Sequence, residues 1–219
     1  MNSIVLIGAN GKMGQIAKAA IENMPEFSIV HCAVRGENLA KILKSTKPDI
    51  ALDLSNHESV TQNAWTIVEH NIKPLIGASG MSKEDIEKLK QICEQKKLGG
   101  LVVPNFSLAF AFINDMSKLL AKYYDDVSIV EYHHAEKKDK PSGTARNTAQ
   151  ILGLREDQIA SVRAKGFLAK QQIYFQSDSE RIIIDHESFS RKSFVKGIQL
   201  SVEKIMKLNS LYVGLESIL

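Results

Sequence analysis

The chain has 219 residues, a formal net charge of +3 and 44% hydrophobic residues, which is the composition of an ordinary globular protein with one or two domains. So small a charge gives no reason to expect nucleic acid or a membrane surface as a partner. No run of about 18 apolar residues occurs, and the first residues begin a strand rather than a signal sequence, so we expect a cytoplasmic protein without a membrane span. Cys32 and Cys93 lack metal-ligand spacing, so we expect reduced thiols and no metal site.

The N-terminal stretch predicts a dinucleotide-binding turn. Residues 3–7 form a continuous apolar run that suits a buried parallel strand, and a helical pattern begins right after residues 8–14, G-A-N-G-K-M-G. Glycines at such a turn let the backbone approach a pyrophosphate, and the helix N-terminus offers unpaired N–H groups. Asn10 stands where the commonest fingerprint has its middle glycine. A plain tight turn is therefore the alternative interpretation, but the strand–turn–helix context favours a dinucleotide.

Arg35 follows the second predicted strand, residues 27–34. An acidic residue at this point holds the ribose hydroxyls of NADH, whereas an arginine accommodates the 2′-phosphate of NADPH. Arg35 therefore favours NADPH, and Glu37, two residues later, keeps NADH possible.

Strands and helices then alternate. Strands are predicted at residues 50–54, 74–76 and 100–103, with helices between them. This alternation predicts a Rossmann-type, doubly wound parallel sheet, which binds ligands at the carboxyl ends of its strands. Each end taken alone could be an ordinary loop; together they predict a cofactor cleft from residues 8–14, Arg35 and residues 53–55, 77–80 and 104–107.

After residue 104 the pattern changes. A helix is expected at residues 108–122, and strand patterns dominate between residues 127 and 185. We expect a smaller α+β domain with an open mixed sheet, mostly antiparallel, over residues 105–194. Residues 1–104 would form the dinucleotide-binding domain, completed by residues 195–219, whose helix should pack back on it.

Residues 131–144 hold the densest group of titratable side chains, between a predicted strand and a predicted helix. His133 and His134 should point to opposite faces of the strand, so only one can face a given cleft, where a histidine suits general acid work. Lys137 could hold a substrate carboxylate, and Ser142, Gly143 and Thr144 open a helix whose N–H groups suit an anion. A solvated loop is the alternative; zinc binding and serine-nucleophile chemistry lack the required spacings.

The same stretch carries a family resemblance. Residues 131–145, E-Y-H-H-A-E-K-K-D-K-P-S-G-T-A, resemble the signature E-x-H-H-x-x-K-x-D-x-P-S-G-T-A of the dihydrodipicolinate reductase family. Residues 8–14 resemble that family's G-A-x-G-R-M-G. Further resemblances are L-D-L-S at 52–55, G-A-S-G at 77–80, P-N-F-S at 104–107 and S-R-K-S-F at 190–194.

The resemblance implies an NAD(P)H-dependent reduction of 4-hydroxy-tetrahydrodipicolinate to tetrahydrodipicolinate, in the pathway to diaminopimelate and lysine. It implies a small dicarboxylate substrate and a homotetramer built by the second-domain sheet. His133 would be the proton donor and Lys137 its catalytic partner. The substrate would be bound by His134, Lys137, Ser142, Gly143 and Thr144. The cofactor would contact Gly8, Gly11, Lys12, Met13, Arg35, Leu54, Gly77, Ala78, Ser79, Pro104, Asn105 and Phe106.

The chain departs from the family pattern at several points. Glu136 stands where the family often has a third histidine, and Leu54 replaces an aromatic residue. Residues 169–172, A-K-Q-Q, replace a usual G-E-H, and the chain is short between residues 35 and 49. Two alternatives therefore stay open: an NADP-binding regulatory or sensor protein without this activity, and another dehydrogenase of small amino acids or semialdehydes. The roles of Glu136 and Lys138 and any feedback by lysine also stay open.

Overall fold

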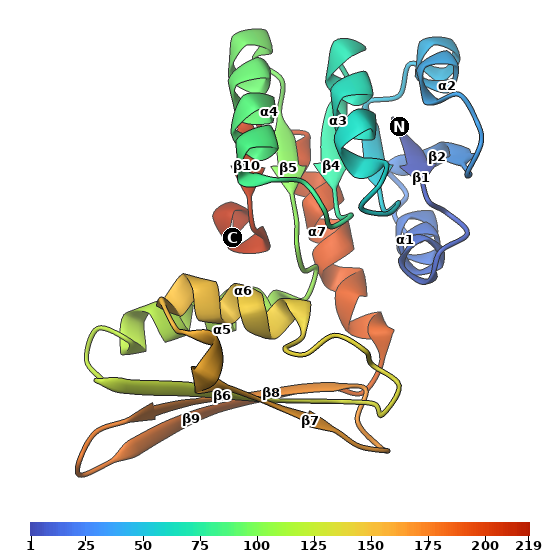
Figure 1. Cartoon of the computed structure of the whole chain (residues 1–219). Helices are drawn as coiled ribbons and strands as arrows, with labels where there is room; N and C mark the ends of the chain where they lie inside the picture. The colour runs from blue at the N-terminus through green and yellow to red at the C-terminus, as the bar shows by residue number, and fades with distance from the viewer. The chain divides into compact units, whose positions relative to one another are not determined.

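The computed structural model describes all residues from Met1 to Leu219 and divides into two compact units. The first unit comprises Met1–Ser107 and Phe194–Leu219, and the second comprises Leu108–Ser193. Figure 1 shows their elements, and each unit is described by itself below.

The first unit is built on a six-stranded sheet with the strand order β10-β5-β4-β3-β1-β2. Every neighbouring pair is parallel, as predicted for a Rossmann-type fold. The central strands are mostly apolar and largely buried because both faces of the sheet are covered. The strands are β1 (Asn2–Ile7), β2 (Phe27–Ala33), β3 (Ile50–Asp53), β4 (Lys73–Ile76), β5 (Gly100–Val102) and β10 (Leu211–Val213).

Helices cover both faces of this sheet. One face packs against α2 (Leu39–Thr46), α3 (Val60–Glu69) and α4 (Lys83–Lys96), whose apolar side chains share a core with the strands. On the other side, α1 (Lys12–Glu22) packs against α7 (Val195–Ile205), and Gln199 Nε2 donates to the carbonyl oxygen of Ala20 at 3.1 Å. Gly197 lies so close to the chain that a Cβ there would be 1.8 Å from the carbonyl oxygen of Phe106. The C-terminal helix is thus an integral layer of this unit.

The sequence patterns placed most elements within a few residues but missed β10. The pattern predicted only a helix within residues 195–219, whereas α7 ends at Ile205 and is followed by β10 and a 3₁₀ turn, Leu215–Ile218. A three-residue strand is too short to show a periodicity, and its position is set by pairing with β5.

The second unit is a four-stranded mixed sheet in the order β7-β6-β8-β9. β6 pairs in parallel with β7, and the other pairs are antiparallel. Figure 1 shows α5 and α6 on one face of this sheet. The strands are β6 (Asp126–His133), β7 (Ile159–Arg163), β8 (Ala169–Gln176) and β9 (Arg181–Ser188); the helices are α5 (Leu108–Leu120) and α6 (Gly143–Leu152), with 3₁₀ turns at Glu156–Gln158 and Arg191–Phe194.

Alternation along the strands separates an inner face from an open face. Val127, Ile129 and Phe175 are buried beneath the two helices. The intervening residues point the other way, and among them Val162 and Ile183 are 36% and 48% exposed. Within this unit the open face therefore carries apolar side chains that no helix covers.

No helix of the structure combines the length and apolarity needed to span a lipid bilayer. Both cysteines are free, as predicted, and burial raises the pKa of the Cys93 thiol to about 11.

His186 makes the stability of the second unit sensitive to pH. Its Nδ1 is buried without a hydrogen-bond partner, and its ring packs edge-on against Phe110 with 4.7 Å between centroids. Burial lowers the pKa of His186 below 6.5, and the neighbouring Asp185 only partly opposes this. The unfolded chain therefore binds this proton more readily than the folded chain.

We expect the free energy of unfolding to fall as the pH drops below about 6.5, by at most about 1.4 kcal/mol per pH unit from this one group. His186→Phe removes the titration and keeps the contact with Phe110, so the variant should lose less stability between pH 7.5 and 5.5. Urea unfolding at several pH values measures both proteins. Identical pH slopes would show that His186 does not titrate differently on folding.

Candidate active site

The glycine turn of the first unit has the geometry that its sequence predicted. Gly8 has φ +80°, and a Cβ on it would lie 2.6 Å from the carbonyl oxygen of Leu54. A Cβ on Gly14 would lie 2.2 Å from the carbonyl oxygen of Gly8, so α1 can approach the turn only because that position is glycine. Gly11 is the N-cap of α1 and provides no capping side chain. The N–H groups of the first turn, including those of Lys12 and Met13, therefore face outward for an anion.

A cavity of about 370 Å³ lies beside this turn. Its walls come from the ends of β1 and β2 and from the segment after β3. The lining residues are Ile7, Gly8, Ala33, Val34, Arg35, Gly36, Glu37, Leu39, Ser55, Asn56, Glu58, Ser59 and Asn63. The place of the cavity at the carboxyl ends of parallel strands, its glycine edge and its polar wall fit the sugar and base of a nucleotide.

Arg35 and Glu37 have different environments at the rim of this cavity. The Glu37 carboxylate accepts a hydrogen bond from the Val34 N–H at 2.8 Å and lies 3.3 Å from His31 Nε2. The Val34 N–H, helped by His31, holds the pKa of Glu37 below its ordinary value. Glu37 thus bonds to its own turn and to His31 rather than to Arg35.

Asp53 holds the polar wall of the cavity in place through buried hydrogen bonds. It is fully buried; its carboxylate accepts hydrogen bonds from the Ser55 N–H at 2.8 Å and from Asn63 Nδ2 at 3.0 Å. Its carbonyl oxygen accepts from the N–H groups of Gly77 and Ala78. Burial raises the pKa of Asp53, against the opposing effect of its hydrogen bonds. The residue therefore ties the ends of β3 and β4 together.

The remaining predicted cofactor residues are brought together at the ends of β3, β4 and β5. A Cβ on Gly77 would lie 2.6 Å from Leu54 Cδ2 and 2.4 Å from the Phe106 ring, and both of these side chains are buried. Asn105 Oδ1 accepts from the Ser107 N–H at 2.9 Å and shapes the following turn. The buried side chains of Leu54 and Phe106 therefore help to fix the course of the backbone at Gly77. Ser79 and Pro104 lie in the same two segments.

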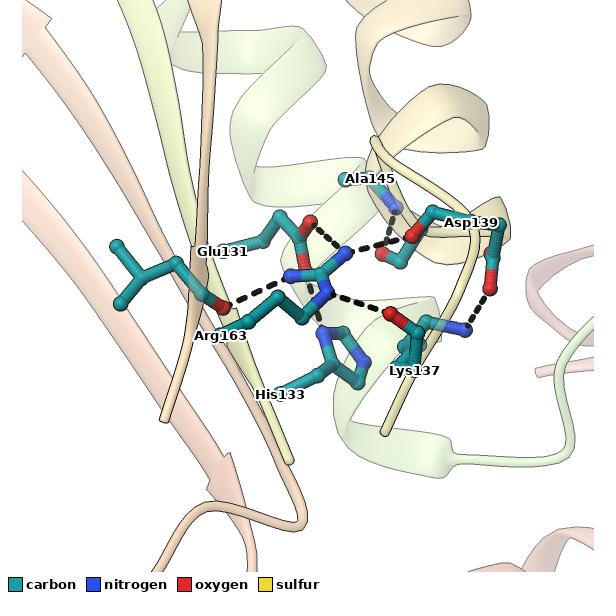
Figure 2. A network of polar contacts seen from close by, with 8 residues as sticks. Glu131, His133, Lys137, Asp139, Ala145 and Arg163 are labelled. Atoms are coloured by element: carbon teal, nitrogen blue, oxygen red, sulfur yellow. Dashed lines mark hydrogen bonds and ion pairs between the residues drawn. The ribbon is translucent and has the colours of Figure 1, made fainter. Parts of the chain in front are cut away.

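In the second unit, Glu131, His133 and Arg163 form one buried network, shown in Figure 2. Glu131 and His133 are two residues apart on β6, so their side chains lie on the same face of the sheet. One Glu131 carboxylate oxygen bonds to His133 Nδ1, and the other accepts from Arg163 Nη2 at 2.7 Å. The sequence pattern placed His133 directly after this strand, whereas β6 includes it as its last residue.

The guanidinium of Arg163 links the network to the loop that carries the predicted lysine. Its Nε donates to the carbonyl oxygen of Lys137 at 3.3 Å, and Nη2 also donates to that of Asp139 at 2.7 Å. Its Nη1 donates to the carbonyl oxygen of Val162 at 2.8 Å. Figure 2 shows the guanidinium between Glu131 on one side and this loop on the other.

The two titratable groups of the network have lowered pKa values for different reasons. Burial alone would raise the pKa of Glu131, but hydrogen bonds led by the one from Arg163 outweigh it and hold the pKa below the ordinary value. Burial lowers the pKa of His133, and the Glu131 carboxylate only partly opposes this. Glu131 is therefore the charged member, and His133 is neutral above its lowered pKa.

Lys137 and the start of α6 complete the predicted set. Lys137 Nζ pairs with Asp139 Oδ1 at 2.8 Å, and the lysine side chain is 23% exposed. Ser142 is the N-cap of α6 and accepts a hydrogen bond from the Ala145 N–H at 3.2 Å. Gly143 is exposed with open space around its Cα. The first N–H groups of α6, on Gly143 and Thr144, are thus available for an anion.

Sequence reasoning did not assign roles to Glu131, Arg163 or Asp139. Glu131 and Asp139 lie within the 131–145 signature, whose spacing alone could have drawn attention to them. Arg163 is distant in sequence, and only the pairing of β6 with β7, which places His133 beside it, brings it into the network.

The chain matches known proteins along its whole length. Sequence models of the dihydrodipicolinate reductase N-terminus and C-terminus match residues 2–106 and 106–219. A 4-hydroxy-tetrahydrodipicolinate reductase of Legionella pneumophila is 36% identical over 99% of this chain and 98% of its own length. The Coxiella burnetii protein of that name is 34% identical over 99% of both chains. A solved structure, dipicolinate-bound dihydrodipicolinate reductase from Paenisporosarcina sp. TG-14, has a TM-score of 0.88 and 29% identity and covers 100% of both chains.

Proposed function

Since the chain belongs to the dihydrodipicolinate reductase family, and so is an NAD(P)H-dependent oxidoreductase of lysine and diaminopimelate biosynthesis, we propose a specific division of roles among its residues. The first unit holds the nicotinamide cofactor, and the second binds and protonates 4-hydroxy-tetrahydrodipicolinate. The observation that carries the proposal is that His133, Lys137 and the N-terminus of α6 all lie between the end of β6 and the first turn of α6. Dehydrogenases that share only the fold give no reason to expect this set.

His133 is the proton donor. The cofactor supplies a hydride, so the protein must place the acceptor and provide a proton. The His133 side chain is 13% exposed, with Nδ1 held by Glu131, so Nε2 is its reactive nitrogen. A histidine in this state can act as a general acid near neutral pH.

The carboxylates of the substrate are bound by charge and by the α6 N-terminus. Lys137 exchanges Asp139 for a substrate carboxylate, and the N–H groups of Gly143 and Thr144 bind the second one; Ser142 and His134 are the further substrate-binding residues that we assign. The dipicolinate-bound relative supports this choice, because dipicolinate is a small dicarboxylate. Two negative charges near His133 also favour its protonated form, so arrival of the substrate would prepare the acid.

The first unit fits a dinucleotide. The glycine turn leaves room for a pyrophosphate at the N-terminus of α1, and the cavity of about 370 Å³ beside Gly8 suits the adenosine end. The cofactor contacts are those predicted at Gly8, Gly11, Lys12, Met13, Arg35, Leu54, Gly77, Ala78, Ser79, Pro104, Asn105 and Phe106.

NADPH is the preferred form of the cofactor. Arg35 lines the cavity, and the nearby Glu37 carboxylate is held by Val34 and His31 instead of by this arginine. The guanidinium can therefore pair with a 2′-phosphate.

His133→Gln should lower kcat by roughly 10²- to 10⁴-fold, as loss of a general acid typically does. We expect the kcat of the wild type to fall as rising pH deprotonates His133, and the variant should lose this fall. The measurement is NADPH oxidation at 340 nm with substrate made by the preceding synthase. A variant with the wild-type rate and pH profile would remove His133 from the mechanism.

Lys137→Ala is the companion variant in that assay. It should raise KM for the substrate and lower kcat, because Lys137 binds a carboxylate near the reacting atoms. Lys122→Ala, an exposed lysine of the same unit, should change neither constant.

Arg35→Ala should raise KM for NADPH by about 10- to 100-fold, the effect of losing a charged hydrogen bond, and should leave KM for NADH nearly unchanged. Initial rates with each cofactor measure the ratio. Lys44→Ala, which removes an exposed cation from α2, is the matched control. Equal losses with both cofactors would contradict a role at the 2′-phosphate.

A homotetramer, built by the open face of the second-unit sheet, is the assembly we propose. Ile183 and Val162 are partly exposed there, and association would remove them from water. Sedimentation equilibrium at micromolar concentration should give the mass of four chains, and Ile183→Lys should give a smaller species. A wild-type monomer under these conditions would overturn the proposal.

A further inference from the structure

Glu131 is a fully buried carboxylate, and the sequence analysis gave it no role. It lies two residues before His133 on β6, and each of its oxygens has a partner, one on His133 and one on Arg163. Burial of a carboxylate costs several kcal/mol of desolvation, which only well-placed partners offset. The two partners of Glu131 are the proposed proton donor and an arginine that also bonds to the Lys137 loop.

We propose that Glu131 and Arg163 are positioning residues for the proton donor and the substrate-binding lysine. Glu131 fixes the imidazole of His133 so that Nε2 is the atom that gives up the proton. Arg163 keeps Glu131 in place and ties the backbone of the Lys137 loop to the same carboxylate. The inference rests on the proposed role of His133, but its structural part can be tested without turnover.

The tautomer argument follows from hydrogen-bonding capacity. An ionised carboxylate only accepts hydrogen bonds, so His133 Nδ1 must carry a hydrogen to bond to Glu131 Oε2. Nε2 is then unprotonated in the neutral ring and carries the exchangeable proton in the charged ring. A proton leaving from Nε2 leaves the bond to Glu131 intact, so the ring need not turn during the reaction.

The geometry of Arg163 explains why arginine stands there. Its side chain is 6% exposed, and its three nitrogens donate to Glu131 and to carbonyl oxygens of Val162, Lys137 and Asp139. A lysine would keep the charge but could not span a carboxylate and a loop with one planar group. The guanidinium thus makes the proton donor and the Lys137 loop parts of one rigid assembly.

Charge balance links this assembly to substrate binding. The opposite charges of Glu131 and Arg163 cancel each other. The other charged groups near His133 are Lys137 and its partner Asp139. Protonation of His133 therefore adds an uncompensated positive charge, which the carboxylates of the substrate would balance. Removing the Glu131 charge should make protonation of His133 harder at every pH.

The first test reads the tautomer directly. In ¹⁵N-resolved NMR spectra, neutral His133 of the wild type should carry its proton on Nδ1, and Glu131→Gln should lose this preference. The same spectra of Arg163→Lys should retain the Nδ1 proton with altered shifts, since Glu131 remains. A His133 proton on Nε2 in the wild type would overturn the inference.

The second test separates positioning from catalysis. Glu131→Gln should lower kcat by about 10- to 1000-fold and change KM by less than about 3-fold, since the buried group does not touch substrate. The pH at which kcat falls should move lower, because His133 loses its carboxylate. Arg163→Lys should instead raise KM, through a looser Lys137 loop, with a smaller shift of the profile.

Controls keep the outcomes distinct. Asp126→Asn makes the same chemical change at the exposed start of β6 and should leave kcat, KM and the pH profile unchanged. Glu131→Asp keeps a carboxylate and should recover part of the rate; it also serves if Glu131→Gln fails to fold, judged by circular dichroism and urea unfolding.

A folded Glu131→Gln enzyme with the wild-type kcat and pH profile would overturn the positioning role. If instead His133→Gln stays active, the proposed proton donor is wrong, while the tautomer measurement still decides whether Glu131 orients the ring.

Discussion

The second unit depends on one constraint, that the carboxylate of Glu131 is buried and must be satisfied on both oxygens. A buried charge left with one missing partner costs about 3–5 kcal/mol, which is a large part of the stability of a small domain. The partners come from two places, His133 on the same strand and Arg163 on the neighbouring parallel strand. The pairing register of β6 with β7 and the conformation of the 134–142 loop thus depend on the Glu131 carboxylate, which also holds the His133 imidazole.

In the first unit, backbone atoms rather than buried charges shape the candidate cofactor site. Gly8 and Gly14 bring the turn, β3 and α1 so close that any Cβ would collide with main-chain atoms. An anion at the α1 N-terminus would then meet backbone N–H groups, which do not titrate. Asp53 supports the arrangement from beneath by fixing the segment after β3. In the proposed division of roles, the first unit would bind the cofactor largely through backbone groups, and the second would supply the titratable groups for proton transfer.

This difference explains what sequence analysis could predict. Glycine at fixed spacing, an apolar strand before it and a helix after it are local requirements, so residues 8–14 predicted the turn, and the alternation of strands and helices predicted the parallel sheet. The ordered pattern of residues 131–145 led to the family, which the full-length matches confirm. Arg163 could not be predicted, because its importance arises from its bond to Glu131, 32 residues earlier in the chain, which the pairing of β6 with β7 makes possible. β10 was missed for a similar reason: its three residues are too few to show a pattern, and its place is set by pairing with β5.

The lowered pKa of His133 is consistent with a proton donor when the whole cycle is considered. A permanently charged imidazole would need a permanent counter-charge, and the one available carboxylate, Glu131, is already paired with Arg163. Burial therefore favours the neutral ring, and a dicarboxylate substrate would bring two negative charges that favour protonation. Under the proposed roles, proton uptake would be coupled to occupancy of the site, so that the acid forms when a substrate can receive its proton. Arg163 would serve the same coupling, since its guanidinium bonds both to Glu131, which holds the His133 ring, and to the backbone of the Lys137 loop proposed to bind the carboxylates.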